Sequence, residues 1–437
     1  MNKSLDQQLD QQNDYTLNMI EKYKNSVQDN SLTILGSKTL TNLQFTDQIN
    51  AHKVFISSCP QINVQIVPNN VTELHIYDSK LKSIQGIQQM KLQILNLEQN
   101  FINDLSPLSE MTTLVQLNLS KNKIIHITPL KLLKNLEKLE LAVNQIVDIS
   151  ELKELTKLKE LSLKNNQIRD ISSLNNLNIS KLDLRSNKIV NTEPLKYNQA
   201  LKSLHISSNK LINTQSIEMN TGLCDLGLYC TQISNINHLK VLVSIKSLYL
   251  GLNNLKDIEP IKNMVFLEEL YMYKNQINDV TPLQHLQKII ILELCSNQII
   301  DISPLKNLKQ LKELNLYENQ ICNIDAIQGL TNLNTLYIGE NYITNMSPIS
   351  NHQNKQQYEI GDQNIPTNQL IILSNKLGII YMLQQRKCKI NELKQEYKIN
   401  RSKQMKKLTR QLQGVVQLEF QFMGLVQVFI SDSCDYQ

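Results

Sequence analysis

The sequence predicts an α/β solenoid in which a parallel β-sheet lines the concave face and short 3-10 turns cover the convex face. Three observations predict it. A 22-residue pattern, LxxLxLxxNxIxxIxPLxxLxx, recurs along the chain. The LxL stretch of each unit alternates with period 2, as the side chains of a strand do. A proline recurs later in the unit, and its fixed φ and missing N–H disfavour a full α-helix there.

The strand elements come first in each unit. Segments such as "LQILNLEQNFINDLSPLSEMTT" and "LVQLNLSKNKIIHITPLKLLKN" align over 22 residues, and thirteen such units fill residues 71–354. The spacing shortens to 21 only from position 79 to 100 and from 166 to 187. No unit can bury both of its sides alone, so stacked units should bury one continuous column of leucines.

An asparagine follows each strand, at the ninth position of the unit. Its side-chain amide can pair with backbone groups that a buried turn would otherwise leave unsatisfied. We expect an Asn ladder formed by Asn100, Asn122, Asn144, Asn166, Asn187, Asn209, Asn253, Asn275, Asn297, Asn319 and Asn341. Ser79 and Thr231 hold the same position and should do part of the same work.

Turns should close the unit on its outer side. Seven of the ten prolines fall seven residues after the ninth position, namely Pro107, Pro129, Pro194, Pro260, Pro282, Pro304 and Pro348. We therefore expect short 3-10 turns on the convex face, beginning near these prolines.

Units such as "LELCSNQIIDISPLKNLKQ" resemble leucine-rich repeats of the 22-residue subclass found in the regulatory subunit of type-1 protein phosphatase. In repeat consensus they are also similar to bacterial internalins, although no export signal or cell-wall anchor is visible. The resemblance covers about two thirds of the chain and implies a leucine-rich-repeat horseshoe. Relatives that regulate phosphatases bind their partner on the concave face through aromatic and acidic side chains. The resemblance therefore implies a partner on the concave face of this chain. The repeated residues belong to the scaffold, so they do not identify a partner.

The segments outside the repeats divide the chain further. We expect a flexible N-terminal segment at 1–30, degenerate repeats serving as an N-terminal cap at 31–70, and a C-terminal cap and linker at 355–378. Residues 379–437 should form a basic helical tail. Residues 380–413 contain ten Lys or Arg and two Glu, which gives this segment a net charge of +8. Because the whole chain carries +5, the rest of it carries −3.

The tail admits two interpretations. In the first it is a solvated helix whose apolar stripe packs on the last repeat or pairs with a second copy as a coiled coil. In the second, which gives an alternative function for the chain, it associates with nucleic acid or an anionic membrane, with a steep dependence on salt.

The sequence carries no sign of catalysis. The seven histidines are scattered, and we find no metal-binding motif and no glycine-rich phosphate loop, so we expect no enzyme, no cofactor and no metal site. His75 and His205 should be solvated residues on the strand face. Seven scattered cysteines and no apolar signal or spanning segment favour an intracellular protein, cytoplasmic or nuclear, that is neither secreted nor transmembrane.

Tyrosine is concentrated on one face of the predicted sheet. The third, fifth and seventh positions of each unit point outward, and these 39 positions hold seven of the 15 tyrosines. Six of the seven lie in the later units, where three glutamates are interleaved with them. The candidate partner-binding residues are Tyr229, Tyr249, Glu269, Tyr271, Tyr273, Glu293, Glu313, Tyr317 and Tyr337.

Two explanations of this concentration remain open. Tyrosine suits a pleated strand, and neighbouring rings can stack along a sheet. Tyrosine is also a preferred anchor of protein interfaces, because it offers a large area with few rotatable bonds. We favour the second explanation. It makes the chain a non-enzymatic protein-interaction scaffold that binds another protein on its concave face, for which a Ser/Thr phosphatase is the most concrete candidate.

Overall fold

The structure is a computed structural model that describes residues 18–43, 46, 48–64, 70–350 and 357–360. The chain divides into two compact units, residues 1–365 and 366–437, and every described residue belongs to the first. The predicted basic tail at 379–437 and most of the predicted cap at 355–378 therefore lie outside the described residues. No helix within the described ranges has the length and apolar character needed to cross a membrane.

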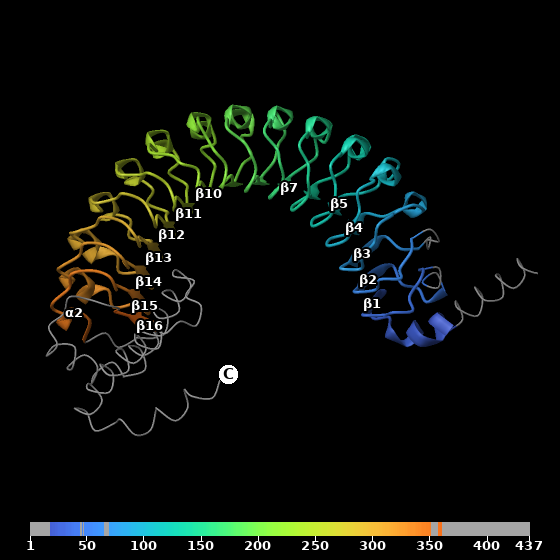
Figure 1. The fold of residues 1–437 in the computed structure, drawn as a ribbon, viewed down its shortest axis with the longest axis horizontal. Coiled ribbons are helices and arrows are strands. Elements are labelled where there is room, and N and C mark those ends of the chain that lie inside the picture. Colours follow the sequence, from blue (N-terminus) through green and yellow to red (C-terminus); the bar gives the residue numbers. More distant parts are fainter. Residues whose placement is uncertain (1–17, 44–45, 47, 65–69, 351–356, 361–437) are drawn as a thin grey trace, which may run out of the picture. The chain divides into compact units, whose positions relative to one another are not determined.

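One parallel sheet of 16 strands runs through the described residues, and each strand pairs with the next strand in the chain. The strands line the inner side of the repeat array and the 3-10 helices lie on its outer side (Figure 1). This architecture confirms the predicted solenoid. The strands are β1 (Ser31–Leu35), β2 (Lys53–Ser57), β3 (Glu73–Tyr77), β4 (Ile94–Asn96), β5 (Gln116–Asn118), β6 (Lys138–Glu140), β7 (Glu160–Ser162), β8 (Lys181–Asp183), β9 (Ser203–His205), β10 (Asp225–Gly227), β11 (Ser247–Tyr249), β12 (Glu269–Tyr271), β13 (Ile291–Glu293), β14 (Glu313–Asn315), β15 (Thr335–Tyr337) and β16 (Gln357–Glu359).

Strands β3 to β15 belong to the thirteen units seen in the sequence, and three further strands extend the same sheet. β1 and β2 lie in the segment 31–70, and β2 pairs with β3 in register. β16 pairs with β15 at the other end. Both ends of the leucine column are thus covered by one or more strands that depart from the repeat sequence.

The core is a column of leucines at the centre of the strands. Leu248, Leu270 and Leu292 are register partners on β11, β12 and β13, and all three are fully buried. The residues on either side of each leucine point outward and keep part of their surface exposed. Because side chains alternate along a strand, this register fixes which residues form the concave surface.

The outer side of the array consists of short 3-10 helices. Six of them carry proline in their first two positions, and Pro348 lies in the four-residue helix α2 (Ser347–Ser350), as the proline spacing predicted. The 3-10 helices are η1 (Lys24–Ser26), η3 (Ile87–Gln89), η4 (Ser106–Leu108), η5 (Thr128–Leu132), η6 (Ser150–Glu154), η7 (Ser172–Leu174), η8 (Glu193–Tyr197), η9 (Gln215–Met219), η10 (Asn237–Val241), η11 (Glu259–Ile261), η12 (Thr281–Leu283), η13 (Ser303–Asn307) and η14 (Asp325–Gly329).

The turn after each strand passes through a left-handed residue just before the ninth position. The φ angles of Val143, Leu252 and Lys274 are 58°, 53° and 52°. For residues other than glycine this conformation costs roughly 1–2 kcal/mol. The repeat therefore needs an interaction at this turn that offsets a recurring cost.

The ladder asparagine supplies that interaction, as Asn275 illustrates. Its Nδ2 donates to the carbonyls of Met272 and Tyr273 in its own unit, at 3.0 and 3.3 Å, and to Leu250 in the preceding unit at 3.0 Å. Its Oδ1 accepts a hydrogen bond from the Leu255 amide at 3.0 Å. One buried side chain thus holds its own turn and joins two successive units.

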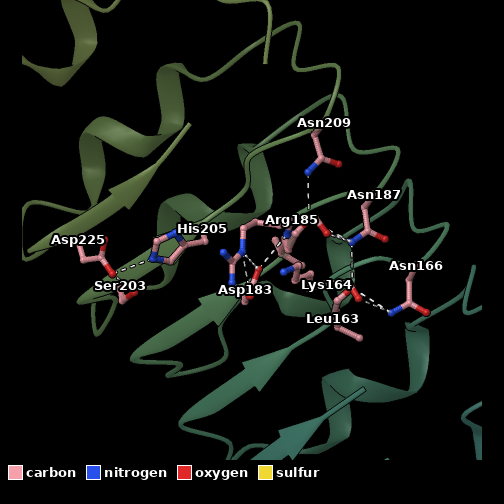
Figure 2. Close-up of polar contacts among 11 residues, drawn as sticks. Leu163, Lys164, Asn166, Asp183, Arg185, Asn187, Ser203, His205, Asn209 and Asp225 are labelled. Atoms are coloured by element: carbon pink, nitrogen blue, oxygen red, sulfur yellow. Dashed lines mark hydrogen bonds and ion pairs between the residues drawn. The ribbon is translucent and has the colours of Figure 1, made fainter. Parts of the chain in front are cut away.

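The arrangement repeats along the array. Figure 2 shows Asn166, Asn187 and Asn209 in a row. Each of them donates to backbone carbonyls of two units. Thr231, which replaces asparagine in one unit, is fully buried and donates one hydrogen bond to the Leu228 carbonyl at 2.8 Å. Its shorter side chain does part of the work of the amide.

Replacing Asn275 by Leu should lower the free energy of unfolding by roughly 1–3 kcal/mol, because it leaves buried backbone carbonyls and one amide without partners. The exposed Asn278, three residues later, provides a control in the same turn region. Urea unfolding of Asn275→Leu and Asn278→Leu measures both effects. An equal loss of stability in the two variants would contradict the role of the ladder.

Candidate functional site

The concave surface has two halves with different chemistry. From β3 to β9 each outward-facing carboxylate is paired with a lysine or arginine. Lys138 lies between Glu140 and Glu160, at 3.5 and 3.3 Å, and Lys181 contacts Glu160 at 2.9 Å. The hydrogen bond from Lys181 is the main reason that the pKa of Glu160 lies below its ordinary value. This half of the surface neutralises its own charge.

The two halves meet at Arg185 and His205, as Figure 2 shows. The Arg185 guanidinium donates hydrogen bonds to both carboxylate oxygens of Asp183, the shorter at 2.6 Å. On the next strands, His205 Nε2 and Ser203 Oγ both lie 2.8 Å from the same oxygen of Asp225. Burial raises the pKa of Asp225, but these hydrogen bonds outweigh it and bring the pKa below its ordinary value.

The combination of Ser203, His205 and Asp225 contains the residue types of a hydrolytic triad but not its geometry. A nucleophilic serine must donate its proton to the imidazole, and the imidazole must be held by the carboxylate through its other nitrogen. Here the hydroxyl and the imidazole compete for one carboxylate oxygen. The cluster therefore positions the His205 ring and does not activate a serine.

The histidines on the strand face are more enclosed than the sequence predicted. The His75 ring stacks on Phe55 at 4.4 Å between centroids and lies 3.0 Å from Glu73. Only 17% of the His75 side chain and 23% of the His205 side chain are exposed. The expectation that both are solvated was wrong, because Phe55 and Glu73 enclose the His75 ring, and Asp225 and Tyr249 enclose the His205 ring.

Two glycines on the concave surface of the later units leave space that side chains of adjacent units occupy. A Cβ added to Gly227 would lie 2.6 Å from Nδ1 of His205, and one added to Gly251 would lie 2.7 Å from Cε1 of Tyr273. A side chain at either position would collide with a ring. The glycines therefore let aromatic rings from adjacent units lie across them.

Each gap is bridged by a pair of rings. Across Gly227, the His205 and Tyr249 rings approach to 5.8 Å between centroids. Across Gly251, the Tyr229 and Tyr273 rings approach to 5.7 Å. The rings thus form contacts that skip one strand, which the spacing of the repeat does not reveal.

Among the described residues, Tyr249 and Tyr271 form the closest tyrosine pair. They are register partners on β11 and β12, and their rings stack at 4.8 Å with planes 9° apart. The Tyr249 hydroxyl donates to Glu269 at 3.2 Å. Burial, followed by the charges of Glu269 and Asp225, raises the pKa of Tyr249 to about 12. Burial also raises the pKa values of Tyr271 and Tyr273.

Two glutamates, Glu293 on β13 and Glu313 on β14, lie beside these tyrosine rings. Glu293 is the register partner of Tyr271 and accepts a hydrogen bond from Asn315 at 2.7 Å. Burial raises the pKa of the Glu293 carboxyl, and Glu313 adds to the rise against the opposing effect of Asn315. This region therefore concentrates negative charge next to aromatic surface.

The remaining candidate residues lie at the far end of the array. Tyr317 follows β14 and is 36% exposed, and its amide donates to the Asn315 side chain at 3.1 Å. Tyr337 is half-buried on β15, in the same row as Tyr271 but three strands further along. The predicted residues thus follow the sheet from β10 to β15.

Sequence reasoning missed His205, Gly227 and Gly251 as parts of this surface. A signal was present, because glycine weakens a strand and its occurrence there often marks close approach by another group.

The described residues include no group of three or more His, Cys, Asp or Glu side chains able to hold a metal ion. Cys295 lies on the concave face beside the rings, and burial raises the pKa of its thiol to about 11. A thiol with this pKa is a poor nucleophile at neutral pH.

Comparisons with known proteins agree with this architecture. The family model for leucine-rich repeats in two copies matches residues 134–176, 243–285, 287–329 and 309–351. An internalin of Listeria monocytogenes is 35% identical to the chain, with a TM-score of 0.64 over 67% of this chain and 87% of that one. A leucine-rich-repeat protein of Leptospira interrogans is 25% identical, with a TM-score of 0.72 over 79% of this chain and 93% of that one.

A more distant likeness concerns the fold alone. The ectodomain of a plant receptor kinase from Arabidopsis thaliana, solved in complex with Casparian strip integrity factor 2, is 19% identical with a TM-score of 0.55. The match covers 77% of this chain and 50% of that one. No curated protein sequence matches the chain significantly.

Replacing Gly251 by Ala should displace the Tyr273 ring and separate it from Tyr229, because the new methyl group would occupy the place of the ring. Near-ultraviolet circular dichroism detects the change, since the chain has 15 tyrosines and no tryptophan. Gly222→Ala is the matched control, because the added Cβ there would meet the flexible end of Lys202 at 2.9 Å. A tyrosine signal that is unchanged in Gly251→Ala would contradict the ring-crossing geometry.

Tyr249 should ionise late in an alkaline titration followed by tyrosinate absorbance. The folded protein holds its pKa at about 12, against 10.0 for a free tyrosine. The contribution of the Tyr249 hydroxyl to the free energy of unfolding is complete below about pH 10 and is lost as the pH rises towards 12. Tyr249→Phe should remove one late-ionising group, whereas in denaturant all tyrosines should ionise together. If the number of late-ionising groups does not change in this variant, the enclosed position of Tyr249 is wrong.

Proposed function

This chain belongs to the leucine-rich-repeat family, and from that premise we propose that it is a non-enzymatic scaffold that binds a partner protein on its concave face. The proposed binding surface extends from β10 to β15. It contains the predicted residues Tyr229, Tyr249, Glu269, Tyr271, Tyr273, Glu293, Glu313, Tyr317 and Tyr337. Members of this family are typically interaction modules, and the surface would give the fold its specificity.

The observation that carries the proposal is the pairing of rings across this part of the sheet. Tyr249 stacks on Tyr271, and Tyr273 packs against Tyr229. Each ring is only partly buried, so part of its surface faces solvent on the concave side. Large aromatic surfaces that are already fixed lose little conformational entropy on binding, which favours a tight interface.

Ring stacking was the alternative explanation for the tyrosines, and the two explanations are compatible. Packing along the sheet accounts for the contacts between rings. It does not account for the concentration of tyrosine in the later units, since β4 to β9 have the same backbone and carry no tyrosine at their outward-facing positions. A surface selected for a partner accounts for both features.

The proposal extends to a protein partner and not to a particular class of partner. The resemblance in sequence to a phosphatase regulator suggested a Ser/Thr phosphatase, but the solved structures described above are an internalin, another bacterial protein and a plant receptor. Association with nucleic acid or an anionic membrane was predicted from residues 379–437. It remains a prediction from sequence, because those residues lie outside the described part of the chain.

The triple variant Tyr249→Ala/Tyr271→Ala/Tyr273→Ala should lose most of the binding partner captured by the wild-type chain. Removing three central aromatic anchors typically weakens an interface by at least about 2 kcal/mol, or roughly thirtyfold. Affinity capture from lysate of the source cells, followed by binding measurements with the purified partner, checks this result.

Tyr197→Ala provides the control, because Tyr197 is 54% exposed at the end of η8 on the outer side. Circular dichroism must show that both variants are folded. If the folded triple variant retains the same partner with the same affinity, the concave aromatic surface is not the binding site.

A further inference from the structure

The outward-facing carboxylates of the later units follow a regular spacing. In the third-position row, Asp225, Glu269 and Glu313 lie on β10, β12 and β14, while β11, β13 and β15 carry uncharged residues. Since neighbouring strands are about 4.8 Å apart, carboxylates two strands apart begin roughly 9.6 Å from each other at the backbone.

The acidic residues of the two halves differ in their partners. All five outward-facing acids from β3 to β9 form ion pairs, namely Glu73 with Lys53, Glu98 with Lys121, Glu140 with Lys138, Glu160 with Lys138 and Lys181, and Asp183 with Arg185. Among the described residues, Glu269, Glu293 and Glu313 have no Lys, Arg or His nitrogen within 4.0 Å of their carboxylates. The outward-facing positions from β10 to β15 contain no Lys or Arg.

Asp225 differs from the glutamates because an imidazole nitrogen, that of His205, lies 2.8 Å from one of its oxygens, whereas Glu269 and Glu293 accept hydrogen bonds from the uncharged groups of Tyr249 and Asn315. The carboxylates without a cationic partner in the described part of the chain are therefore those of Glu269, Glu293 and Glu313, on three consecutive strands. Glu293 lies on the strand between those of the other two and is the diagonal neighbour of Glu313, whose own register partner is Ile291. The two carboxylates are close enough that the charge of Glu313 raises the pKa of Glu293. A cation bound here would offset like-charge repulsion that no Lys, Arg or His of the described residues compensates.

Aromatic surface adjoins these carboxylates. One face of the Tyr271 ring is stacked on Tyr249, which leaves the opposite face turned toward β13 and Glu293. A tyrosine face attracts a Lys or Arg side chain through cation–π interaction and contact with its aliphatic stem. The carboxylates and the ring thus favour the same kind of group.

We propose that the surface from β12 to β14 binds a basic segment of the partner protein in the polyproline II conformation, with basic residues three positions apart. This inference rests on the proposed function and names the chemistry of its partner. A polyproline II helix brings residues i and i+3 to the same side about 9.3 Å apart, which matches two strand steps of roughly 9.6 Å. A β-strand places residues i and i+2 on one side only about 6.7 Å apart, which does not match. Aromatic-lined surfaces also recognise polyproline II segments in other binding modules.

Fluorescence anisotropy with a labelled peptide tests the proposal on the full chain. The probe is Lys-Pro-Pro-Lys-Pro-Pro-Lys, and the comparison peptide, Lys-Lys-Lys-Pro-Pro-Pro-Pro, has the same composition with adjacent lysines. The wild-type chain should bind the spaced peptide more tightly, and added salt should weaken binding. Glu269→Gln/Glu313→Gln should weaken it by roughly fivefold or more, because two ion pairs are lost.

Glu140→Gln/Glu160→Gln is the matched control, since it changes the net charge by the same amount on carboxylates that already have lysine partners. It should change the affinity by less than about twofold. Equal affinity for the two peptides, no binding at all, or equal effects of the two double variants would overturn the proposal. Each of these results would leave the proposed function intact if the tyrosine triple variant still loses its protein partner. Retention of that partner would overturn the proposed function even if the peptide binds as expected.

Discussion

The buried asparagine amide is the interaction on which the rest of the structure depends. Each unit turns out of its strand through a left-handed residue, and in most units that residue is not glycine. The amide of Asn275 donates to three carbonyls and accepts from one backbone amide, across two units. The same side chain therefore offsets the cost of the turn and fixes the distance between neighbouring strands. Since a slip of one residue would exchange the two faces of a strand, the ladder also fixes which residues reach the concave surface.

Because the register is fixed, outward-facing residues at the same position of successive units form rows on the concave face. The residue types in these rows can vary without changing the scaffold. Glycine at two outward positions gives rings room to cross a strand, so that Tyr273 reaches Tyr229 and His205 reaches Tyr249. These contacts tie together units that are two apart. The rings are held by each other, and rings fixed in this way would contribute most to the affinity of the interface proposed above.

Much of the fold was predictable because its determinants are local and repeated. The LxL alternation predicted the strands, the 22-residue recurrence predicted that the units stack, and prolines such as Pro282 predicted the beginnings of outer turns. The surface was less predictable. The enclosure of His205 depends on Gly227 in the next unit and on Asp225, and the repeat pattern places no constraint on these positions. Asn198 and Asn220 were also missed, because they replace core leucines of the outer side and bond to carbonyls there. Features of this kind depend on the volumes and charges of particular neighbours, which a consensus averages away.

The contrast between the halves follows from how each half satisfies its charge. In the earlier units, every outward carboxylate has a lysine or arginine on its own or an adjacent unit, so an incoming ion would have to displace an existing pair and would gain little. In the later units, the glutamates adjoin tyrosines and amides, which can donate hydrogen bonds but cannot cancel a charge. Partial burial strengthens the interaction of such carboxylates with an incoming cation, because less water screens it. Within the described residues, the uniform scaffold therefore carries one half whose outward carboxylates are paired with lysine or arginine and one half whose glutamates have no such partner.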